Sequence, residues 1–272
     1  MSSHLTVLKL GGSLLTDKSH PYVVREDIIA SVSKEIRECM DSGLIQFLVL
    51  VHGVGSYGHP PVLEHKLHKG FLGTEQLLPI SKTQAIVGEF RALLVKHLQE
   101  AEIPVCLMYP SSMIIAEKMK IIDFYLEPLK AWLKMGTVPL LGGDMLVDTA
   151  MGWSVGSGDQ MAVILSKELC AKRLIFASDV SGIYESEPKE NPDAQIIHEI
   201  NLNEVDSILE RLSKSGTKDA SGAMKGKLHS ILPAKDLIEN GLDVTIMSMM
   251  KYGTLTKLLE NEEDIGTKIV SK

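Results

Sequence analysis

The sequence has few cysteines and a deficit of positive charge. Its three cysteines, Cys39, Cys106 and Cys170, are far apart and form no C-x-x-C pair, so we expect reduced core thiols rather than disulfides or a zinc cluster. Its 28 lysines and arginines face 35 aspartates and glutamates, which leaves a formal net charge of -7. A negative field repels nucleic acid and anionic membranes, so neither is an expected partner, and an anionic substrate needs a local cationic site.

Long hydrophobic runs are also missing. The first apolar run begins at Leu5, but Lys9 interrupts it and Gly11 and Gly12 follow it, so no signal peptide is expected. No other stretch approaches the roughly 20 apolar residues of a membrane span. Internal repeats and low-complexity linkers are absent too. With 44% hydrophobic residues the 272-residue chain can bury a sizeable core, and we expect a cytoplasmic protein.

What is present is an alternation of short β-rich runs with longer helical patterns. The expected strands cover residues 5–10, 46–51, 103–108, 137–141, 173–177 and 243–247. The expected helices cover about 28–40, 82–101 and 157–169, and a fourth runs from about 224 and stops at Gly241. The polar segment 185–195 predicts a loop or hairpin, and the polar segment 214–223 predicts a loop. Most strand runs are continuously apolar, which is typical of a parallel sheet covered on both faces. The order predicts an α/β fold of βαβ units, with both halves sharing one sheet.

Ligands of open α/β sheets bind beyond the carboxyl ends of the strands, and several expected strands here end in glycine. The first runs into Lys9-Leu10-Gly11-Gly12-Ser13, with Lys18 nine residues after Lys9. Adjacent glycines let backbone N–H groups approach phosphate oxygens, and the two lysines could flank a transferring phosphoryl group. The alternative for this segment alone is a simple turn with two solvated lysines.

The second glycine cluster, Gly53-Val54-Gly55-Ser56-Tyr57-Gly58-His59, contains G-x-G-x-x-G after a strand. Pro60 and Pro61 follow it, and we expect them to block the helix that a dinucleotide-binding fold needs at this point. The segment therefore predicts an anion-accepting loop that ends in an imidazole able to donate to a phosphate. An ordinary loop histidine is the alternative for His59.

The remaining clusters carry carboxylates or lysine. Asp159 opens an expected helix, where it either caps the helix or holds Lys9 and Lys18 through charge-assisted hydrogen bonds. Asp179 follows the strand at 173–177 and begins Asp179-Val-Ser-Gly-Ile-Tyr. The segment from Gly222 to Lys227 is too short for a Walker A loop, but its position near a helix N-terminus suits a nucleotide phosphate.

The order of these clusters resembles the amino acid kinase superfamily, and the resemblance covers nearly the whole chain. The matching segments are Lys9–Ser13, residues 53–58, Ser157–Gln160, Asp179–Tyr184 and Gly222–Lys227. Within the superfamily, the loop from His52 to Pro60 is similar to that of the isopentenyl phosphate kinases. The resemblance implies an open αβα sandwich formed by a single domain over 1–272. It also implies a phosphoacceptor half near 1–170 and an ATP half near 171–272.

By the same resemblance, the reaction is ATP-dependent phosphorylation of isopentenyl phosphate to isopentenyl diphosphate in isoprenoid biosynthesis, by the alternate mevalonate pathway. ATP comes with Mg²⁺ as a substrate complex, and no protein-bound metal site is expected. The implied catalytic residues are Lys9, Lys18, His59 and Asp159. The implied ATP-binding residues are Lys9, Gly11, Gly12, Ser13, Gly55, Asp179, Tyr184, Gly222, Ala223 and Lys227. The implied acceptor-binding residues are Val54, Gly58, His59 and Gly158.

Two features lie outside the motifs. Ile86, Phe90 and Leu94 have helical spacing and could form an apolar wall for the isoprenoid tail, although plain core packing explains them equally well. Ala223 departs from the family pattern, which has two adjacent glycines there. Its methyl group makes a backbone contact to ATP less certain at Ala223 than at Gly222.

Three other functions compete with this interpretation. The first is a fosfomycin-type phosphonate kinase, which shares the histidine, and the second is a kinase of a carboxylate or carbamate, for which His59 has no obvious use. The third is a non-catalytic nucleotide or metabolite sensor, against which the joint presence of Lys9, Lys18, Asp159 and Lys227 argues. A homodimer is expected by resemblance alone.

Overall fold

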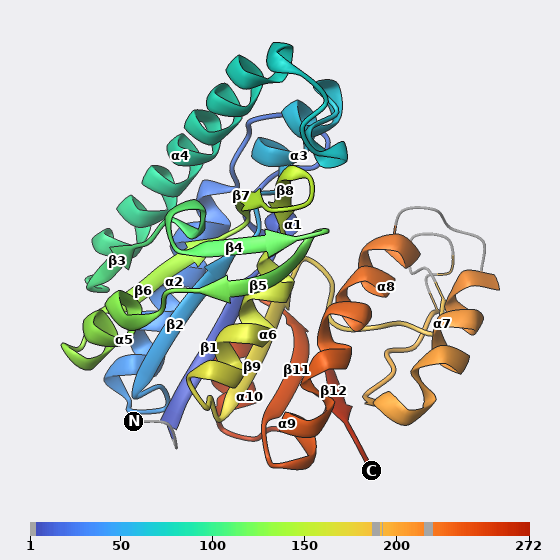
Figure 1. The fold of residues 1–272 in the computed structure, drawn as a ribbon. Helices are drawn as coiled ribbons and strands as arrows, with labels where there is room; N and C mark the ends of the chain where they lie inside the picture. The colour runs from blue at the N-terminus through green and yellow to red at the C-terminus, as the bar shows by residue number, and fades with distance from the viewer. Residues whose placement is uncertain (1–3, 187–190, 192, 215–219) are drawn as a thin grey trace.

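The computed structural model describes residues 4–186, 191, 193–214 and 220–272. An eight-stranded sheet forms its centre, in the order β10-β12-β11-β9-β1-β2-β6-β3. These strands are β1 (Leu5–Leu10), β2 (Phe47–His52), β3 (Val105–Leu107), β6 (Val138–Gly142), β9 (Arg173–Ser178), β10 (Glu199–Asn201), β11 (Asp243–Ser248) and β12 (Thr267–Val270). Every neighbouring pair is parallel except β11 with β12, so the prediction of a mainly parallel α/β sheet is confirmed (Figure 1).

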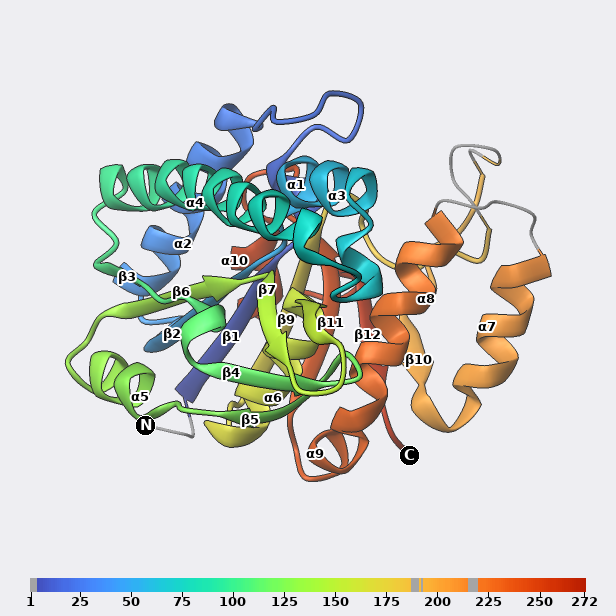
Figure 2. The same cartoon turned by 45° about the horizontal axis from the view of Figure 1, so that its top comes forward.

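Helices cover both faces of this sheet, and side-chain alternation separates two cores. Along β1, Leu5 and Val7 belong to one core, whereas Leu8 and Leu10 belong to the other. The first core packs against α5 (Glu127–Lys134), α6 (Gly158–Glu168) and α8 (Ala220–Ile231), the second against α2 (Glu26–Asp41), α4 (Leu77–Glu100) and α10 (Thr254–Leu259). Figure 2 shows α2 and α4 above the sheet and α5 and α6 below it. Lys9 shares the face of Leu5 and Val7, so alternation directs its side chain toward α6.

A second, four-stranded sheet was not predicted. It contains β4 (Ile114–Glu117), β5 (Lys120–Phe124), β7 (Asp144–Asp148) and β8 (Gly152–Gly156), in the order β5-β4-β7-β8. The buried Asp148 carboxylate accepts backbone N–H bonds from Lys118 and Met119 in one turn and from Ala150 and Met151 in the other, at 2.9 to 3.1 Å. Both turns therefore depend on a carboxylate that is distant from one of them in the sequence, and no local pattern signals them.

The segment after β2 also differs from its prediction. Residues Gly55–Glu64 form α3, which continues through Pro60 and Pro61, so the prediction of a loop there was wrong. Pro60 has no N–H to donate to the carbonyl of Ser56, four residues earlier. That carbonyl instead accepts the backbone N–H of Tyr22 at 3.2 Å. The helix tolerates proline here because another segment of the chain satisfies the freed carbonyl group.

The remaining helices frame the C-terminal half. They are α7 (Val205–Lys214) and α9 (Lys235–Glu239), and α7 lies at the outer margin with α8 between it and the sheet (Figure 2). The short helix α1 (Gly12–Leu15) directly follows β1 in the N-terminal half. Of the two predicted polar segments, residues 220–223 are helical, because α8 begins at Ala220, while 215–219 lie outside the described residues. Tyr184 bridges Ile196 in antiparallel fashion at the base of the other segment, of which 187–190 and 192 also lie outside the described residues. No helix in the described ranges is long and apolar enough to cross a membrane.

Candidate active site

The candidate site lies at the carboxyl ends of four neighbouring strands, β9, β1, β2 and β6. The loops that leave β1 and β2 pack directly on each other. A Cβ atom added to Gly12 would collide with the backbone of Gly55, whose φ is +45°, and a Cβ atom on Gly53 would lie 2.5 Å from the Gly12 nitrogen. Glycine is therefore required for the contact between the two loops, a constraint that the sequence-based interpretation had assigned to phosphate approach alone.

A buried triad of charges forms the floor of the site. Lys9 is 6% exposed, and its Nζ lies 2.7 Å from Asp159 Oδ1. Lys227, on α8, is 7% exposed, and its Nζ lies 4.0 Å from Asp159 Oδ2. Asp159 stands in the first turn of α6, but the cap position belongs to Ser157. Of the two roles considered for Asp159, the structure therefore shows the organisation of lysines rather than a helix cap.

The titration of this triad reflects its burial. Burial by itself raises the pKa of Asp159, but the ammonium groups of Lys9 and Lys227 outweigh it and hold the pKa below its ordinary value. Burial and the neighbouring charge of Lys9 lower the pKa of Lys227 to about 8, although Asp159 acts in the opposite direction. Lys227 also lies over the ring of Phe176, 5.3 Å from its centroid.

Lys18 is organised differently from the two lysines of the triad. Its side chain is 65% exposed, and its Nζ lies 3.9 Å from Asp179 Oδ2. The Ser13 hydroxyl donates to Asp179 Oδ1 at 2.5 Å, and Ser178 donates to the same oxygen at 3.1 Å. The carboxylate partner of Lys18 is thus Asp179 and not Asp159, because Asp159 is engaged by Lys9 and Lys227.

The expected acceptor residues gather at the start of α3 and α6. Val54 is the N-cap residue of α3, Gly58 is buried within it, and His59 is exposed one residue further on. Partial desolvation and the ammonium groups of Lys18 and Lys9 lower the pKa of His59. The imidazole therefore lies within electrostatic reach of both lysines, and it is mainly neutral near pH 7. Gly158 is the first residue of α6 and directly precedes Asp159.

Other expected site residues are placed less directly. Phe90 has no exposed surface and packs against His52 and Tyr57, so it contacts no ligand in this conformation, while Ile86 is partly buried beside it. Tyr184 is half-buried at the bridge to Ile196. Gly222 and Ala223 belong to the first turn of α8, and the surroundings of their side chains lie outside the described part of the chain.

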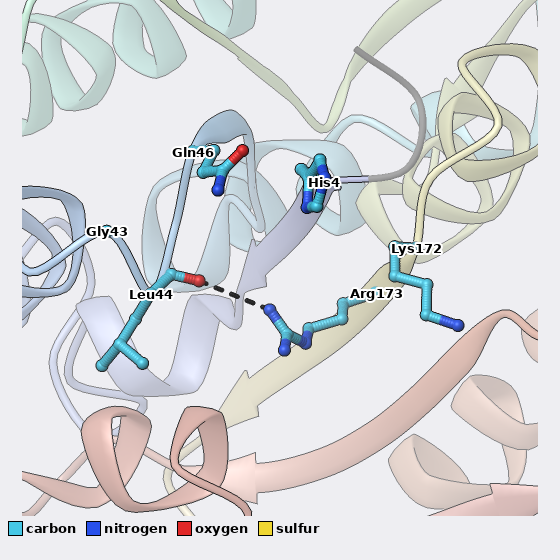
Figure 3. Close-up of a pocket in the computed structure, with 6 residues that line it drawn as sticks. All are labelled: His4, Gly43, Leu44, Gln46, Lys172 and Arg173. Atoms are coloured by element: carbon cyan, nitrogen blue, oxygen red, sulfur yellow. Dashed lines mark hydrogen bonds between the residues drawn. The ribbon is translucent and has the colours of Figure 1, made fainter.

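A shallow pocket at the opposite, amino-terminal edge of the sheet is not part of this site. Its lining residues are His4, Gly43, Leu44, Gln46, Lys172 and Arg173 (Figure 3). Arg173 donates to the Leu44 carbonyl at 3.4 Å, and Lys172 donates to the Gly241 carbonyl at 3.1 Å. Two of the cationic groups of this pocket thus have partners in the protein, and the pocket is remote from the triad of charges.

Sequence reasoning missed a buried Arg91 and its neighbour His52, which lie behind the acceptor residues. A signal was available, since Arg91 falls at helical spacing within the apolar series Val87, Leu94 and Leu98. A charged residue in the middle of an apolar helix face indicates a buried ion pair or a functional group.

Cationic groups from β1, α8 and the segment after α1 thus surround glycine-rich loops at one edge of a parallel sheet, an arrangement suited to two phosphate-bearing ligands. The profile of the amino acid kinase family matches residues 4–248, and the chain belongs to that family.

Individual relatives agree with this assignment. The chain is 33% identical over 235 residues to isopentenyl phosphate kinase of Methanocaldococcus jannaschii, covering 84% of this chain and 86% of that protein. It is 31% identical over 275 residues to isopentenyl phosphate kinase of Methanothermobacter thermautotrophicus, covering 98% and 100% of the two chains. An X-ray structure of an isopentenyl phosphate kinase superposes with a TM-score of 0.80 at 29% identity, covering 98% of this chain and 100% of the other. The open αβα sandwich expected from the resemblance is therefore confirmed.

Proposed function

We propose that this protein is a kinase that transfers the γ-phosphoryl group of ATP to isopentenyl phosphate. An oxygen of the acceptor monophosphate forms a bond to the γ-phosphorus, while the bond from that phosphorus to the bridging oxygen breaks and leaves ADP. The product is isopentenyl diphosphate, a precursor for isoprenoid biosynthesis by the alternate mevalonate pathway. The observation that carries the proposal is the imidazole of His59 at the start of α3, within electrostatic reach of Lys9 and Lys18, in a chain that matches an isopentenyl phosphate kinase over the whole length of that relative.

Phosphoryl transfer needs alignment and charge neutralisation more than covalent help from the protein. In the proposal, Lys9 and Lys18 neutralise the charge that develops on the γ-phosphoryl oxygens, and Lys227 binds the β- and γ-phosphates. Asp159 holds Lys9 and Lys227 at a fixed separation, which stops the two ammonium groups from moving apart when no substrate is bound. These three lysines outnumber Asp159 and Asp179, so the five groups carry a net positive charge that attracts anions to an acidic protein.

The acceptor phosphate is proposed to bind at the N-terminus of α3, near Val54 and Gly58, with Gly158 opposite. His59 donates a hydrogen bond to the phosphate from its neutral ring and takes up a proton as the phosphate dianion arrives, because an adjacent negative charge raises an imidazole pKa. A carboxylate or carbamate acceptor has no phosphate group for this imidazole to bind, and the relatives named isopentenyl phosphate kinase do not favour a phosphonate substrate.

ATP is proposed to occupy the other side, with its phosphates over the loop of Gly11, Gly12, Ser13 and Gly55. Gly222 and Ala223 would contact the phosphates from α8, and Tyr184 and Asp179 would line the nucleoside site. Asp179 also pairs with Lys18, so it can link nucleotide binding to the position of that lysine. Mg²⁺ enters with ATP as part of the substrate. We keep the proposed division of the domain into an acceptor half near 1–170 and an ATP half near 171–272, with the phosphate-binding glycines of the first half shared between the two ligands.

The isoprenoid tail has no polar group, so its recognition depends on an apolar wall and on the depth of the pocket. Ile86 on α4 is proposed as part of that wall, and the fully buried Phe90 supports it from behind. We also propose a homodimer in the cytoplasm. The dimer is testable by sedimentation of the purified protein, and a monomer would contradict it.

The function is tested by incubating the purified protein with Mg²⁺, ATP and a panel of acceptors. The panel contains isopentenyl phosphate, fosfomycin, glutamate and carbamate, and ADP release and the phosphorylated product are both measured. We expect isopentenyl phosphate to give the highest kcat/KM. A preference for any other acceptor in the panel would reject the proposal.

A second test uses two histidines of the same helix segment. His59→Ala is expected to lower kcat/KM for isopentenyl phosphate by about 100-fold, because a hydrogen bond to a charged phosphate is lost. His65 is the C-cap residue of α3: its backbone N–H donates to the Pro61 carbonyl, its carbonyl accepts from Gln76, and its imidazole lies 4.0 Å from the carboxylate of the neighbouring, exposed Glu64. His65→Ala therefore serves as the matched control and is expected to retain wild-type activity.

A further inference from the structure

Arg91 is the largest fully buried side chain of the described residues, and it takes no part in the proposed chemistry. It stands on α4 and is 1% exposed. A buried charge stabilises a fold poorly, and apolar side chains of similar volume commonly replace buried ion pairs without loss of stability. The presence of a guanidinium group at this position therefore calls for a role other than packing.

The polar contacts of Arg91 lie where β2, β6 and β7 meet, and its guanidinium carbon also lies 5.2 Å from the centroid of the Tyr109 ring. Its Nη2 donates to the carbonyl of Gly143 at 2.8 Å and lies 3.4 Å from Asp144 Oδ2, and its Nε donates to His52 Nε2 at 3.3 Å. The Asp144 carboxylate also accepts hydrogen bonds from the backbone N–H groups of Ser111 and Met145, at 3.0 and 2.9 Å. We call Arg91, His52 and Asp144 the arginine network.

These contacts define the state of the His52 ring. Arginine is always protonated and can only donate, so His52 Nε2 must be the acceptor and Nδ1 must carry the proton. Nδ1 lies 3.2 Å from the Gly53 carbonyl and donates to it. Burial and the positive charge of Arg91 lower the pKa of His52 to about 3, so the ring stays neutral. The imidazole thus links α4 to the carbonyl group of the residue that leads into α3.

The ends of β2 and β6 also lie close to the charged triad of Lys9, Asp159 and Lys227. The His52 carbonyl accepts the N–H of Gly143 at 3.0 Å. A Cβ atom added to Gly158 would lie 2.8 Å from that carbonyl oxygen and 3.5 Å from Lys9 Cε. Gly158 directly precedes Asp159, the carboxylate that pairs with Lys9. A displacement of His52 would therefore shift residues at the start of α3 and at the start of α6.

We propose that Arg91 is a positioning residue that, through His52 and Asp144, fixes the Gly53–Val54 turn and with it the acceptor-phosphate site. This inference rests on the proposed function, since it concerns the acceptor side of that site. The glycine loop after β1 and Lys227 on α8 make no hydrogen bond or ion pair with the arginine network. Loss of Arg91 should weaken acceptor binding much more than ATP binding, because the Gly53–Val54 turn belongs to the acceptor site and reaches the ATP loop only through packing of Gly12 on Gly53 and Gly55. General destabilisation does not produce such a difference.

The test compares Arg91→Met, which keeps volume and loses the donors, with Leu98→Ala. Leu98 lies on the same helix, is fully buried and belongs to no part of the network or the site, so its truncation destabilises without touching the acceptor turn. We expect Arg91→Met to raise KM for isopentenyl phosphate by about tenfold or more, with KM for ATP within about twofold of wild type. Leu98→Ala should lower Tm and change neither KM. Equal changes of both KM values in Arg91→Met, or none, would overturn the proposal.

Arg91→Lys keeps the experiment decisive if Arg91→Met fails to fold. Lysine retains the buried charge beside Asp144 but lacks the planar fork that reaches Gly143 and His52 together. The same separation of KM values is expected, along with loss of the Nδ1–H signature of His52 in ¹⁵N NMR. An unchanged His52 spectrum with unchanged KM values would again contradict the role. If wild-type protein does not phosphorylate isopentenyl phosphate, the proposed function is wrong, and the His52 spectra of wild type and Arg91→Lys decide the positioning role alone.

Discussion

Lys9 and Lys18, the two lysines proposed to neutralise the γ-phosphoryl oxygens, differ in burial and in how closely each is paired with a carboxylate. Lys9 is nearly buried on a central strand, and its ammonium group lies 2.7 Å from a carboxylate. Lys18 is 65% exposed after α1, and its closest carboxylate lies 3.9 Å away. The first cation is positioned before any substrate arrives, whereas the second completes its contacts only when phosphate provides them. Pre-positioned charge acts mainly on the transition state, and an exposed charge is screened by water and salt.

Replacement of Lys9 should give the largest effect. Lys9→Met is expected to reduce kcat by about 10³-fold, because it removes a preorganised charge from a water-poor site. Steady-state kinetics with saturating ATP and isopentenyl phosphate measure this, with Tm as the control for folding. A loss of less than about tenfold would place Lys9 outside the group that stabilises the transition state.

The next largest effect should come from replacing Asp159, the carboxylate that pairs with Lys9. Asp159→Asn is expected to lower kcat by about 10²-fold, since Lys9 and Lys227 lose the charge that holds them together. The pKa of Lys227 should also fall further, because Asp159 raises it in the wild type. Wild-type kcat in this variant would show that the triad is not needed to organise the lysines.

Lys18 should matter less and in a salt-dependent way. Lys18→Met is expected to lower kcat/KM by about tenfold at low ionic strength, with a smaller loss at high salt where the wild-type charge is already screened. Kinetics over a series of potassium chloride concentrations measure the effect. Lys34 is an exposed lysine on α2 outside the site, and Lys34→Met provides the matched control. A loss that is independent of salt would remove the contrast between Lys9 and Lys18.

The smallest expected effect is a change in the number of protons that the protein takes up when ATP binds. The pKa of Lys227 is about 8 in the free protein, so the ammonium group loses its proton as pH rises through that value. ATP should restore the charged form, because its phosphates favour it, and binding should take up nearly one proton at pH about 9 and almost none at pH about 7. Calorimetry in buffers of different ionisation enthalpy measures the uptake. Lys227→Met should abolish the difference between the two pH values, and its persistence would assign the proton elsewhere.

Sequence reasoning succeeded where the signal was local. The six expected strands are all present in the central sheet, since each is a short apolar run between helical patterns. It failed at β4 and β5, where the connecting turn uses Lys118 and Met119 at positive φ and depends on Asp148 about 30 residues later. Neither residue type predicts such a turn, because both avoid positive φ.

The site shows the same division. Lys9, Lys227 and Asp159 were expected from motifs, and the structure brings them together. The pairing of Lys18 with Asp179 was not expected, since Asp179 had been assigned to the nucleoside. Motif matching identifies which residues are present but cannot assign carboxylates to cations, because that choice depends on loop packing. Arg91 belongs to no motif, and the sequence signals it only through its place in the apolar series of α4, which the structure confirms by its burial.

Pro60 of α3 has a mechanical consequence for the segment that carries Lys18. Since the helix cannot use the Ser56 carbonyl, that oxygen anchors Tyr22, four residues beyond Lys18, and the rings of Tyr22 and Tyr57 meet edge to face. A helix with a complete ladder would offer no such anchor. The turn from Asp17 to Tyr22 is therefore fastened to the helix that presents His59, and this contact couples the position of the exposed lysine to that of the imidazole.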